Sequence, residues 1–282
     1  MNELISTVEE MTRQRDAALN ELGKLRVQLN NYGLALQPIQ GYVGDRLEWF
    51  FPSGPYLAAS PQRYTDKYAL YKERAGMMRP EEDIAGFVKM NPSQVYDRSR
   101  FYFFCLVLDL INSQKIAGDM AELGVDKGNS ASVLAAAAKR MGKKVYLLDT
   151  FEGFSAKDLV EGDAKYPAYF TNSPLDLVKN NVGVGDHIHY IKGYFPDSTS
   201  QMPNSSSFCL VHLDCDLYKP FASALEYFWP RLVPGGFLIM HDYASLYWDG
   251  VEKAVDDFFA DKAESIVPVP DMSGTVVVRK SK

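Results

Sequence analysis

Acidic and imidazole side chains follow two apolar runs in the second half of the chain. Asp214 closes the run 209–214, and His241 and Asp242 end the run that begins at Gly236. If the two runs are neighbouring parallel strands, their carboxyl ends share one crevice. Oxygen ligands of this kind suit Mg²⁺, which typically takes one or two protein carboxylates and keeps several waters. The pattern predicts a divalent metal site at Asp214, His241 and Asp242, and the alternative is that the carboxylates only cap the helices that follow.

A glycine turn lies upstream, in the segment Glu122-Leu-Gly-Val-Asp-Lys-Gly128, and Asp149 closes a later apolar run. A strand, a glycine turn, a helix and a second strand ending in a carboxylate together hold adenosine-containing cofactors in α/β proteins. Gly124 and Gly128 lack the Gly-x-Gly-x-x-Gly spacing that seats a pyrophosphate. We therefore expect S-adenosylmethionine rather than a dinucleotide, with Asp149 accepting hydrogen bonds from ribose hydroxyls and Ser130 as a polar contact. The alternative is a plain α/β loop.

Apolar runs that alternate with helix-like stretches must position these residues. The expected strands cover 120–124, 144–149, 187–192, 209–214 and 236–241, and the expected helices cover 129–141, 174–181, 219–231 and 249–262. Such alternation predicts an α/β fold with a doubly wound, mostly parallel sheet. Two β-rich runs, 265–268 and 275–279, predict a C-terminal antiparallel hairpin. Residues at the carboxyl ends of the strands would then gather in one crevice: Gly124, Asp149, Gly193, Asp214 and Asp242.

The first 94 residues follow a different pattern. Apolar residues recur as a heptad from Leu4 to Leu29, with Arg15 as the one charged interruption. This predicts an N-terminal helix at 1–30 whose coiled coil would make the chain a homo-oligomer, and the alternative is an amphipathic helix packed on its own domain. Residues 31–94 are rich in aromatic and turn residues and predict either a cap that walls a substrate pocket or an ordinary packed extension, which leaves 95–282 for the α/β domain.

Composition argues against several classes of function. The formal net charge is −6 and no long Lys/Arg cluster is present, so nucleic acid and anionic membranes are poor candidates as main partners and a small molecule is favoured. The longest apolar run, 101–108, is too short to cross a bilayer. Three cysteines without metal-type spacing predict free thiols in a reducing compartment, and the start of the chain lacks a signal-like segment. We expect a cytoplasmic protein.

Five ordered blocks of sequence resemble the macrocin O-methyltransferase family, the sugar O-methyltransferases of macrolide and related antibiotic pathways. The blocks are Glu122-Leu-Gly-Val, Leu148-Asp-Thr-Phe-Glu-Gly-Phe154, Lys192-Gly-Tyr-Phe-Pro-Asp197, His212-Leu-Asp-Cys-Asp-Leu-Tyr218, and Pro234-Gly-Gly with Asp242-Tyr. The resemblance implies a class I methyltransferase domain at 95–282, S-adenosylmethionine as donor, a divalent metal, and transfer to a hydroxyl of a sugar or glycoside. It also implies that Asp214 and Asp242 bind the metal and that Asp214 serves as base.

We predict that nine residues contact the cofactor: Glu122, Gly124, Gly128, Ser130, Asp149, Thr150, Phe151, Gly193 and Tyr194. Members of the family usually carry Asp-Asp-Tyr where this chain has His241-Asp242-Tyr243. A neutral imidazole can bind a metal, and it shifts preference from Mg²⁺ toward borderline ions such as Mn²⁺, Zn²⁺ or Ni²⁺. His241 could instead be a catalytic base or point away from the site, and the sequence leaves these roles open.

Two other functions stay open on sequence alone. The glycine spacing disfavours a nicotinamide-dependent oxidoreductase. The histidine at position 241 and the N-terminal heptads are compatible with a catalytically silent oligomeric scaffold. The acceptor is not specified by any motif, and we expect the cap and the loop at 155–172 to select it.

Overall fold

The computed structural model describes residues 77–92, 94, 97–159, 163, 169–245 and 247–281. The predicted helix at 1–30 and most of the predicted cap at 31–94 lie outside these residues, so both stay predictions. The description below concerns the α/β part of the chain.

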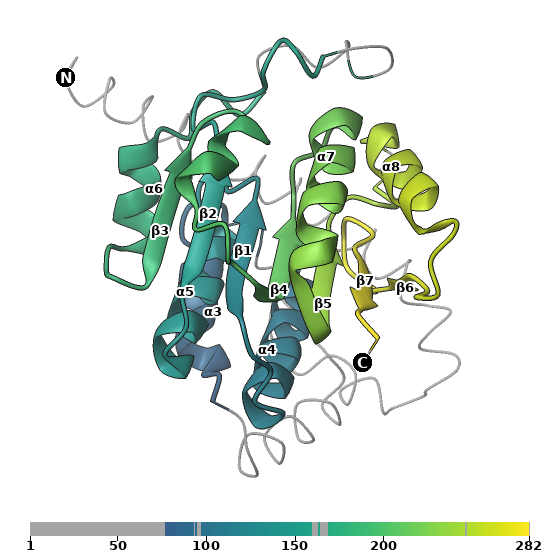
Figure 1. Cartoon of the computed structure of the whole chain (residues 1–282). Coiled ribbons are helices and arrows are strands. Elements are labelled where there is room, and N and C mark those ends of the chain that lie inside the picture. Colours follow the sequence, from purple (N-terminus) through teal and green to yellow (C-terminus); the bar gives the residue numbers. More distant parts are fainter. Residues whose placement is uncertain are drawn as a thin grey trace, which may run out of the picture. The chain divides into compact units, whose positions relative to one another are not determined.

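A single sheet of seven strands forms the centre of the described part, in the order β3-β2-β1-β4-β5-β7-β6 (Figure 1). The strands are β1 Asp119–Leu123, β2 Val145–Asp149, β3 Ile188–Lys192, β4 Phe208–Leu213, β5 Leu232–Met240, β6 Val267–Pro268 and β7 Val276–Arg279. Strands β1 to β5 run parallel, whereas β7 pairs antiparallel with β5 and β6. The expected mostly parallel sheet and its C-terminal antiparallel hairpin are confirmed.

Helices cover both faces of this sheet. They are α3 Pro80–Val88, α4 Arg98–Ser113, α5 Asn129–Met141, α6 Leu175–Val182, α7 Tyr218–Phe228 and α8 Asp249–Phe259. The first four pack over one cluster of buried apolar side chains and the last two over a second cluster, with α7 and α8 on the near side of the sheet in Figure 1. Because both faces are covered, the strands are continuous apolar runs, and every residue of β4 is buried.

The boundaries of several elements differ from those expected, and the largest difference is at the start of β5. The structure starts β5 at Leu232, ahead of the expected start at Gly236, because α7 ends at Phe228 and a 3₁₀ turn leads directly into the strand. A Cβ on Gly236 would lie 3.1 Å from the carbonyl oxygen of Cys209, so glycine allows β5 to approach β4 here. The Pro-Gly-Gly segment at 234–236, which is typical of a turn, therefore lies inside strand β5.

A partly buried ion pair holds α3 on α5. Arg140 donates from both terminal nitrogens to the two carboxylate oxygens of Asp83, each at 2.7 Å. Asp109 of α4 accepts the backbone amides of Met77 and Met78 at 2.7 and 2.9 Å. These contacts fix the segment that precedes α4, part of which lines the pocket described below.

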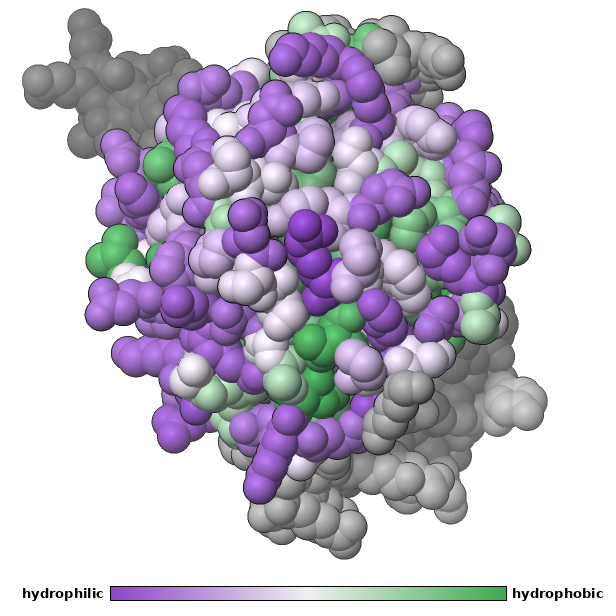
Figure 2. Space-filling view, in the orientation of Figure 1, coloured by the Kyte–Doolittle hydropathy of each residue, from purple (hydrophilic) through white to green (hydrophobic). Residues whose placement is uncertain are grey.

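The visible surface is mainly hydrophilic, and apolar side chains show only in limited areas of the face in Figure 2. Within the described ranges, no helix combines the length and apolar character needed to span a bilayer. Cys105 and Cys209 are buried, and Cys215 is half-buried.

Candidate active site

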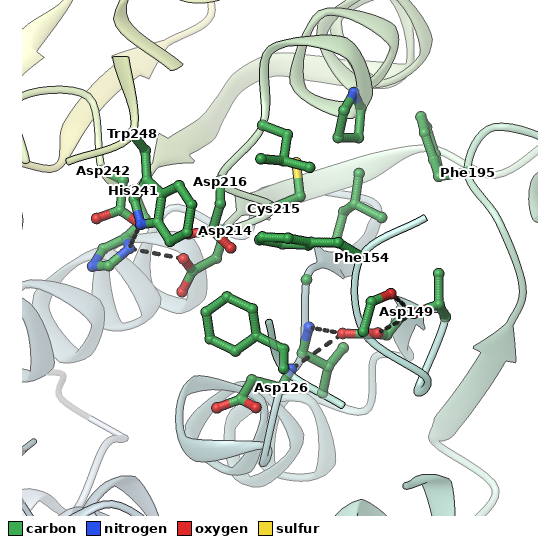
Figure 3. Close-up of a pocket in the computed structure, with 18 of the residues that line it drawn as sticks. Asp126, Asp149, Phe154, Phe195, Asp214, Cys215, Asp216, His241, Asp242 and Trp248 are labelled. Carbon is green, nitrogen blue, oxygen red and sulfur yellow. Dashed lines mark hydrogen bonds and ion pairs between the residues drawn. The ribbon is translucent and has the colours of Figure 1, made fainter. Parts of the chain in front are cut away.

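A pocket of about 320 Å³ opens at the carboxyl ends of the parallel strands. The residues that we expected to gather there all line it: Gly124, Asp149, Gly193, Asp214 and Asp242. In Figure 3, Asp149 lies on one side of the pocket, and Asp214, His241 and Asp242 lie on the other. The volume is at the lower end of the range for small-molecule sites.

The backbone at Gly124, on one side of the pocket, lies directly against the backbone at Asp214, on the other side. Gly124, directly after β1, has a φ of +86°, and a Cβ on it would lie 1.9 Å from the carbonyl oxygen of Asp214. The amide of Asp214 donates to the carbonyl of Leu123 at 2.8 Å, and that of Gly124 donates to Leu148 at 3.0 Å. Only glycine fits this left-handed position against the neighbouring backbone. The glycine turn therefore lies directly against Asp214, the first residue of the acidic cluster formed by Asp214, His241 and Asp242.

Asp149 ties the glycine turn to the end of β2. Its Oδ2 accepts the backbone amides of Val125 at 2.7 Å and Asp126 at 3.2 Å, and its Oδ1 accepts the amide of Phe151 at 2.7 Å. Burial raises the pKa of this carboxyl, although the three amides act in the opposite direction. Oδ2 already accepts two amides, so the acceptor capacity left for a ribose hydroxyl lies on Oδ1, and the predicted ribose contact stays a prediction.

Three of the nine predicted cofactor contacts do not line the pocket. Glu122 is fully buried, where its Oε1 accepts the hydroxyl of Ser130 at 2.5 Å and lies 2.8 Å from Nδ1 of His212. Gly128 packs against α6, because a Cβ there would lie 2.4 Å from a methyl of Val182. Phe151 lies in the apolar core. The remaining six residues line the pocket: Gly124, Ser130, Asp149, Thr150, Gly193 and Tyr194.

The acidic side of the pocket is organised by His241. Its Nδ1 lies 2.8 Å from Oδ1 of Asp214 and 2.8 Å from Oδ2 of Asp242. Burial lowers the pKa of His241, but the charge of Asp214 and the hydrogen bonds to Asp214 and Asp242 together outweigh burial and raise this pKa to about 9. Burial alone would raise the pKa of Asp214, yet the neighbouring His241 holds this pKa below the usual value. Burial and then Asp242 raise the pKa of the adjacent Asp216 well above its usual range.

The same three side chains fit a divalent ion. One ligand atom from each of Asp214, His241 and Asp242 lies within 4.8 Å of the others. Ligands about 2.0–2.3 Å from a shared ion have a comparable spread. The imidazole Nδ1 faces both carboxylates, whereas the buried Nε2 makes no hydrogen bond to the described residues. Two carboxylates and one imidazole form a donor set that suits borderline ions as well as Mg²⁺.

The sequence of the described α/β part matches a known enzyme family. A family profile described as "Macrocin-O-methyltransferase (TylF)" matches residues 93–277. The chain belongs to the macrocin O-methyltransferase family.

Two curated relatives and one solved structure are similar to this chain. The chain is 30% identical over 183 residues to the 8-demethyl-8-(2,3-dimethoxy-alpha-L-rhamnosyl)-tetracenomycin-C 4'-O-methyltransferase of Streptomyces olivaceus, covering 60% of this chain and 68% of that protein. It is 24% identical over 178 residues to the demethyldecarbamoylnovobiocin O-methyltransferase of Streptomyces niveus, covering 58% and 66%. The solved structure of the O-methyltransferase NovP has a TM-score of 0.60 at 18% identity, over 78% of this chain and 99% of that one. The expected family, fold and O-methyltransferase class are confirmed.

An aromatic wall formed by Phe154, Phe170 and Trp248 lines part of the pocket. The ring of Phe154 lies 5.2 Å from that of Phe170 and 5.7 Å from that of Trp248, centroid to centroid. All three line the pocket, and Figure 3 shows Phe154 between Asp149 and Asp214. The rings enclose the space between the two polar sides, which favours exclusion of water.

Replacement of Gly124 tests the contact between the glycine turn and the acidic side. Gly142→Ala is the matched control, because Gly142 also has positive φ but nothing lies within 4 Å of the position that a Cβ would take. We expect Gly142→Ala to lower the free energy of unfolding by about 1–2 kcal/mol through backbone strain alone. Gly124→Ala should cost about 3 kcal/mol or more, because its Cβ also meets Asp214. Urea denaturation measures both, and equal losses would contradict the close approach.

Proposed function

We propose that the chain transfers the methyl group of S-adenosylmethionine to a hydroxyl of a sugar or glycosylated small molecule. The observation that carries the proposal is the approach of Gly124 to Asp214, which brings a glycine turn and an acidic cluster into one pocket. The glycine turn suits the donor, and the cluster suits a hydroxyl acceptor that must lose a proton. Membership of the macrocin O-methyltransferase family supports the same assignment.

The donor would lie along the ends of β1, β2 and β3. Gly124, Ser130 and Asp149 all line the pocket here, and the last two carry side-chain oxygen atoms. Tyr194, after β3, donates its hydroxyl to Asp158 at 2.7 Å, which orders the neighbouring wall of the pocket. The four-residue glycine spacing favours S-adenosylmethionine over a dinucleotide, because no pyrophosphate has to be seated.

The acceptor class rests on the relatives. The Streptomyces olivaceus protein is named for a methylation within a rhamnosyl-tetracenomycin, and a Micromonospora griseorubida relative is named mycinamicin III 3''-O-methyltransferase. The aromatic wall formed by Phe154, Phe170 and Trp248 supports a glycoside, since aromatic rings offer an apolar surface beside the polar groups that fix a ligand's orientation. We propose a glycosyl hydroxyl as the methyl acceptor.

Proton removal is the main chemical task of the protein in this proposal. An alkyl hydroxyl is a poor nucleophile near neutral pH, whereas the sulfonium methyl is already activated. We assign the base to the carboxylate of Asp214, because Nδ1 of His241 is engaged by two carboxylates and orients them. The pocket must then hold the acceptor oxygen in line with the methyl group, and alignment of this kind supplies much of the rate.

Asp214, His241 and Asp242 would hold the divalent ion of this site. A bound ion lowers the pKa of an acceptor hydroxyl and orients it. Because one ligand is an imidazole, we propose that the site prefers a borderline ion such as Mn²⁺ to Mg²⁺. The heptads before residue 30 support self-association, so we also propose a homo-oligomer.

The reaction is tested with the purified full-length chain, S-adenosylmethionine and a panel of glycosides that includes aryl rhamnosides. We expect one methyl group to be added to a glycoside, detected by mass spectrometry, and no addition to the matching aglycones. S-adenosylhomocysteine should also raise the melting temperature, whereas NADH should not, because a ligand stabilises only the protein that binds it. Stabilisation by NADH alone would contradict the proposed donor.

The histidine at position 241 gives the metal preference a direct test. We expect His241→Asp to shift preference toward Mg²⁺, narrowing the ratio of Mn²⁺ to Mg²⁺ affinity by roughly tenfold, because a hard oxygen replaces a nitrogen ligand. Isothermal titration with each ion measures the ratio. Asp186→Asn, which changes an exposed carboxylate outside the pocket, should leave it unchanged. An unaltered ratio in His241→Asp would show that the imidazole does not bind the ion.

A further inference from the structure

Arg100 is a buried cation in the wall of the pocket, and neither the sequence motifs nor the proposed mechanism uses it. It lies in the first turn of α4, is 3% exposed and lines the pocket beside Asp214. Its Nε lies 2.9 Å from Oδ2 of Asp97, and its Nη2 donates to Oε1 of Gln94 at 2.6 Å. The ring of Phe87 lies 5.5 Å from the guanidinium carbon. These neighbours fix the plane of the guanidinium group.

The remaining corner of this guanidinium faces the acidic cluster. Nη1 of Arg100 lies 3.6 Å from Oδ2 of Asp214, while Nδ1 of His241 lies 2.8 Å from the other oxygen, Oδ1. Nη1 is buried and makes no hydrogen bond to any residue that the structure describes. Each oxygen of the Asp214 carboxylate therefore faces a different nitrogen group.

A fixed positive charge at this place opposes a divalent ion. An arginine keeps its proton throughout the ordinary pH range, so Arg100 cannot become neutral when an ion binds to Asp214. Its orientation is held by Asp97 and Gln94, so it cannot easily turn away either. Like charges a few ångströms apart repel each other more strongly at a partly buried site than in water. The repulsion is therefore large enough to change metal affinity measurably.

We propose that Arg100 is a positioning residue that holds Asp214 as a built-in cation and thereby weakens divalent metal binding by Asp214, His241 and Asp242. When no metal ion is bound, Arg100 and His241 then balance the negative charge of Asp214 and keep the cluster assembled. This inference rests on the proposed metal site but is independent of the acceptor and of methyl transfer.

A purely structural role for Arg100 makes the opposite prediction. If the guanidinium only neutralises the buried Asp97, its removal would loosen the start of α4 and the adjoining wall of the pocket. Metal affinity would then stay the same or fall. If Arg100 competes with the ion for Asp214, its removal raises the affinity, and a gain of binding is an effect that local loosening does not produce.

The experiment compares Mn²⁺ binding by full-length wild type, Arg100→Met and Arg100→Lys, followed by electron paramagnetic resonance of the free ion. We expect Arg100→Met to bind Mn²⁺ roughly tenfold more tightly and Arg100→Lys to stay within about threefold of wild type, because lysine keeps the charge. Arg140→Met is the matched control, since it also removes an arginine paired with a buried aspartate, Asp83, but outside the pocket. It should bind Mn²⁺ as wild type does.

Removal of Arg100 also leaves the carboxylate of Asp97 without its ion-pair partner, and this negative charge could itself raise metal affinity. Variants that also carry Asp97→Asn separate this effect from the loss of the arginine charge. Asp97→Asn alone leaves the arginine unneutralised, so Mn²⁺ should bind more weakly than in wild type, and adding Arg100→Met to it should restore or exceed wild-type affinity. Unchanged circular dichroism of each variant shows that it is folded. Equal or weaker binding in Arg100→Met, or no Mn²⁺ binding by any variant, would overturn the proposal. Failure of wild type to methylate the glycoside panel counts against the proposed function alone, because the Mn²⁺ comparison does not use an acceptor.

Discussion

The close approach of Gly124 to Asp214 is the constraint on which the site depends. At this point the turn after β1 lies against the residue that follows β4, with no room for a side chain between them. The hydrogen bond from the Asp214 amide to Leu123 continues the pairing of β1 with β4 to its end. A donor bound at the turn and an acceptor bound at the carboxylate would therefore be neighbours because two strands are neighbours, without any dedicated linking element.

The chemistry of the pocket follows from how its buried charges are balanced. Asp214 and Asp242 share the imidazole of His241, and Arg100 faces the free side of Asp214. Buried carboxylates are costly unless they are paired, so these contacts let the cluster form before any ligand arrives. They also set limits on what the cluster can bind, because each cation already present reduces the attraction for another. Arg100 thus acts against a metal ion at Asp214, whereas a neutral His241 would help to bind it.

Much of this arrangement could be predicted from the sequence, since continuous apolar runs mark buried parallel strands and the ends of such strands meet. Orientation was harder to predict. Glu122 belongs to the expected motif but turns into the core toward His212, because side chains alternate across a strand and the register decides which face each one takes. Arg100 was missed because it lies far from the motifs in sequence, and only the packing of α4 brings it to Asp214.

Electron density from crystals grown with S-adenosylhomocysteine and Mn²⁺ tests the central claim most directly. The account predicts the nucleoside and amino-acid parts along the glycine turn at Gly124, and the ion bound by Asp214, His241 and Asp242 on the opposite side of the contact. Density for the ligand in another part of the molecule, or an ion held without Asp214, would contradict it.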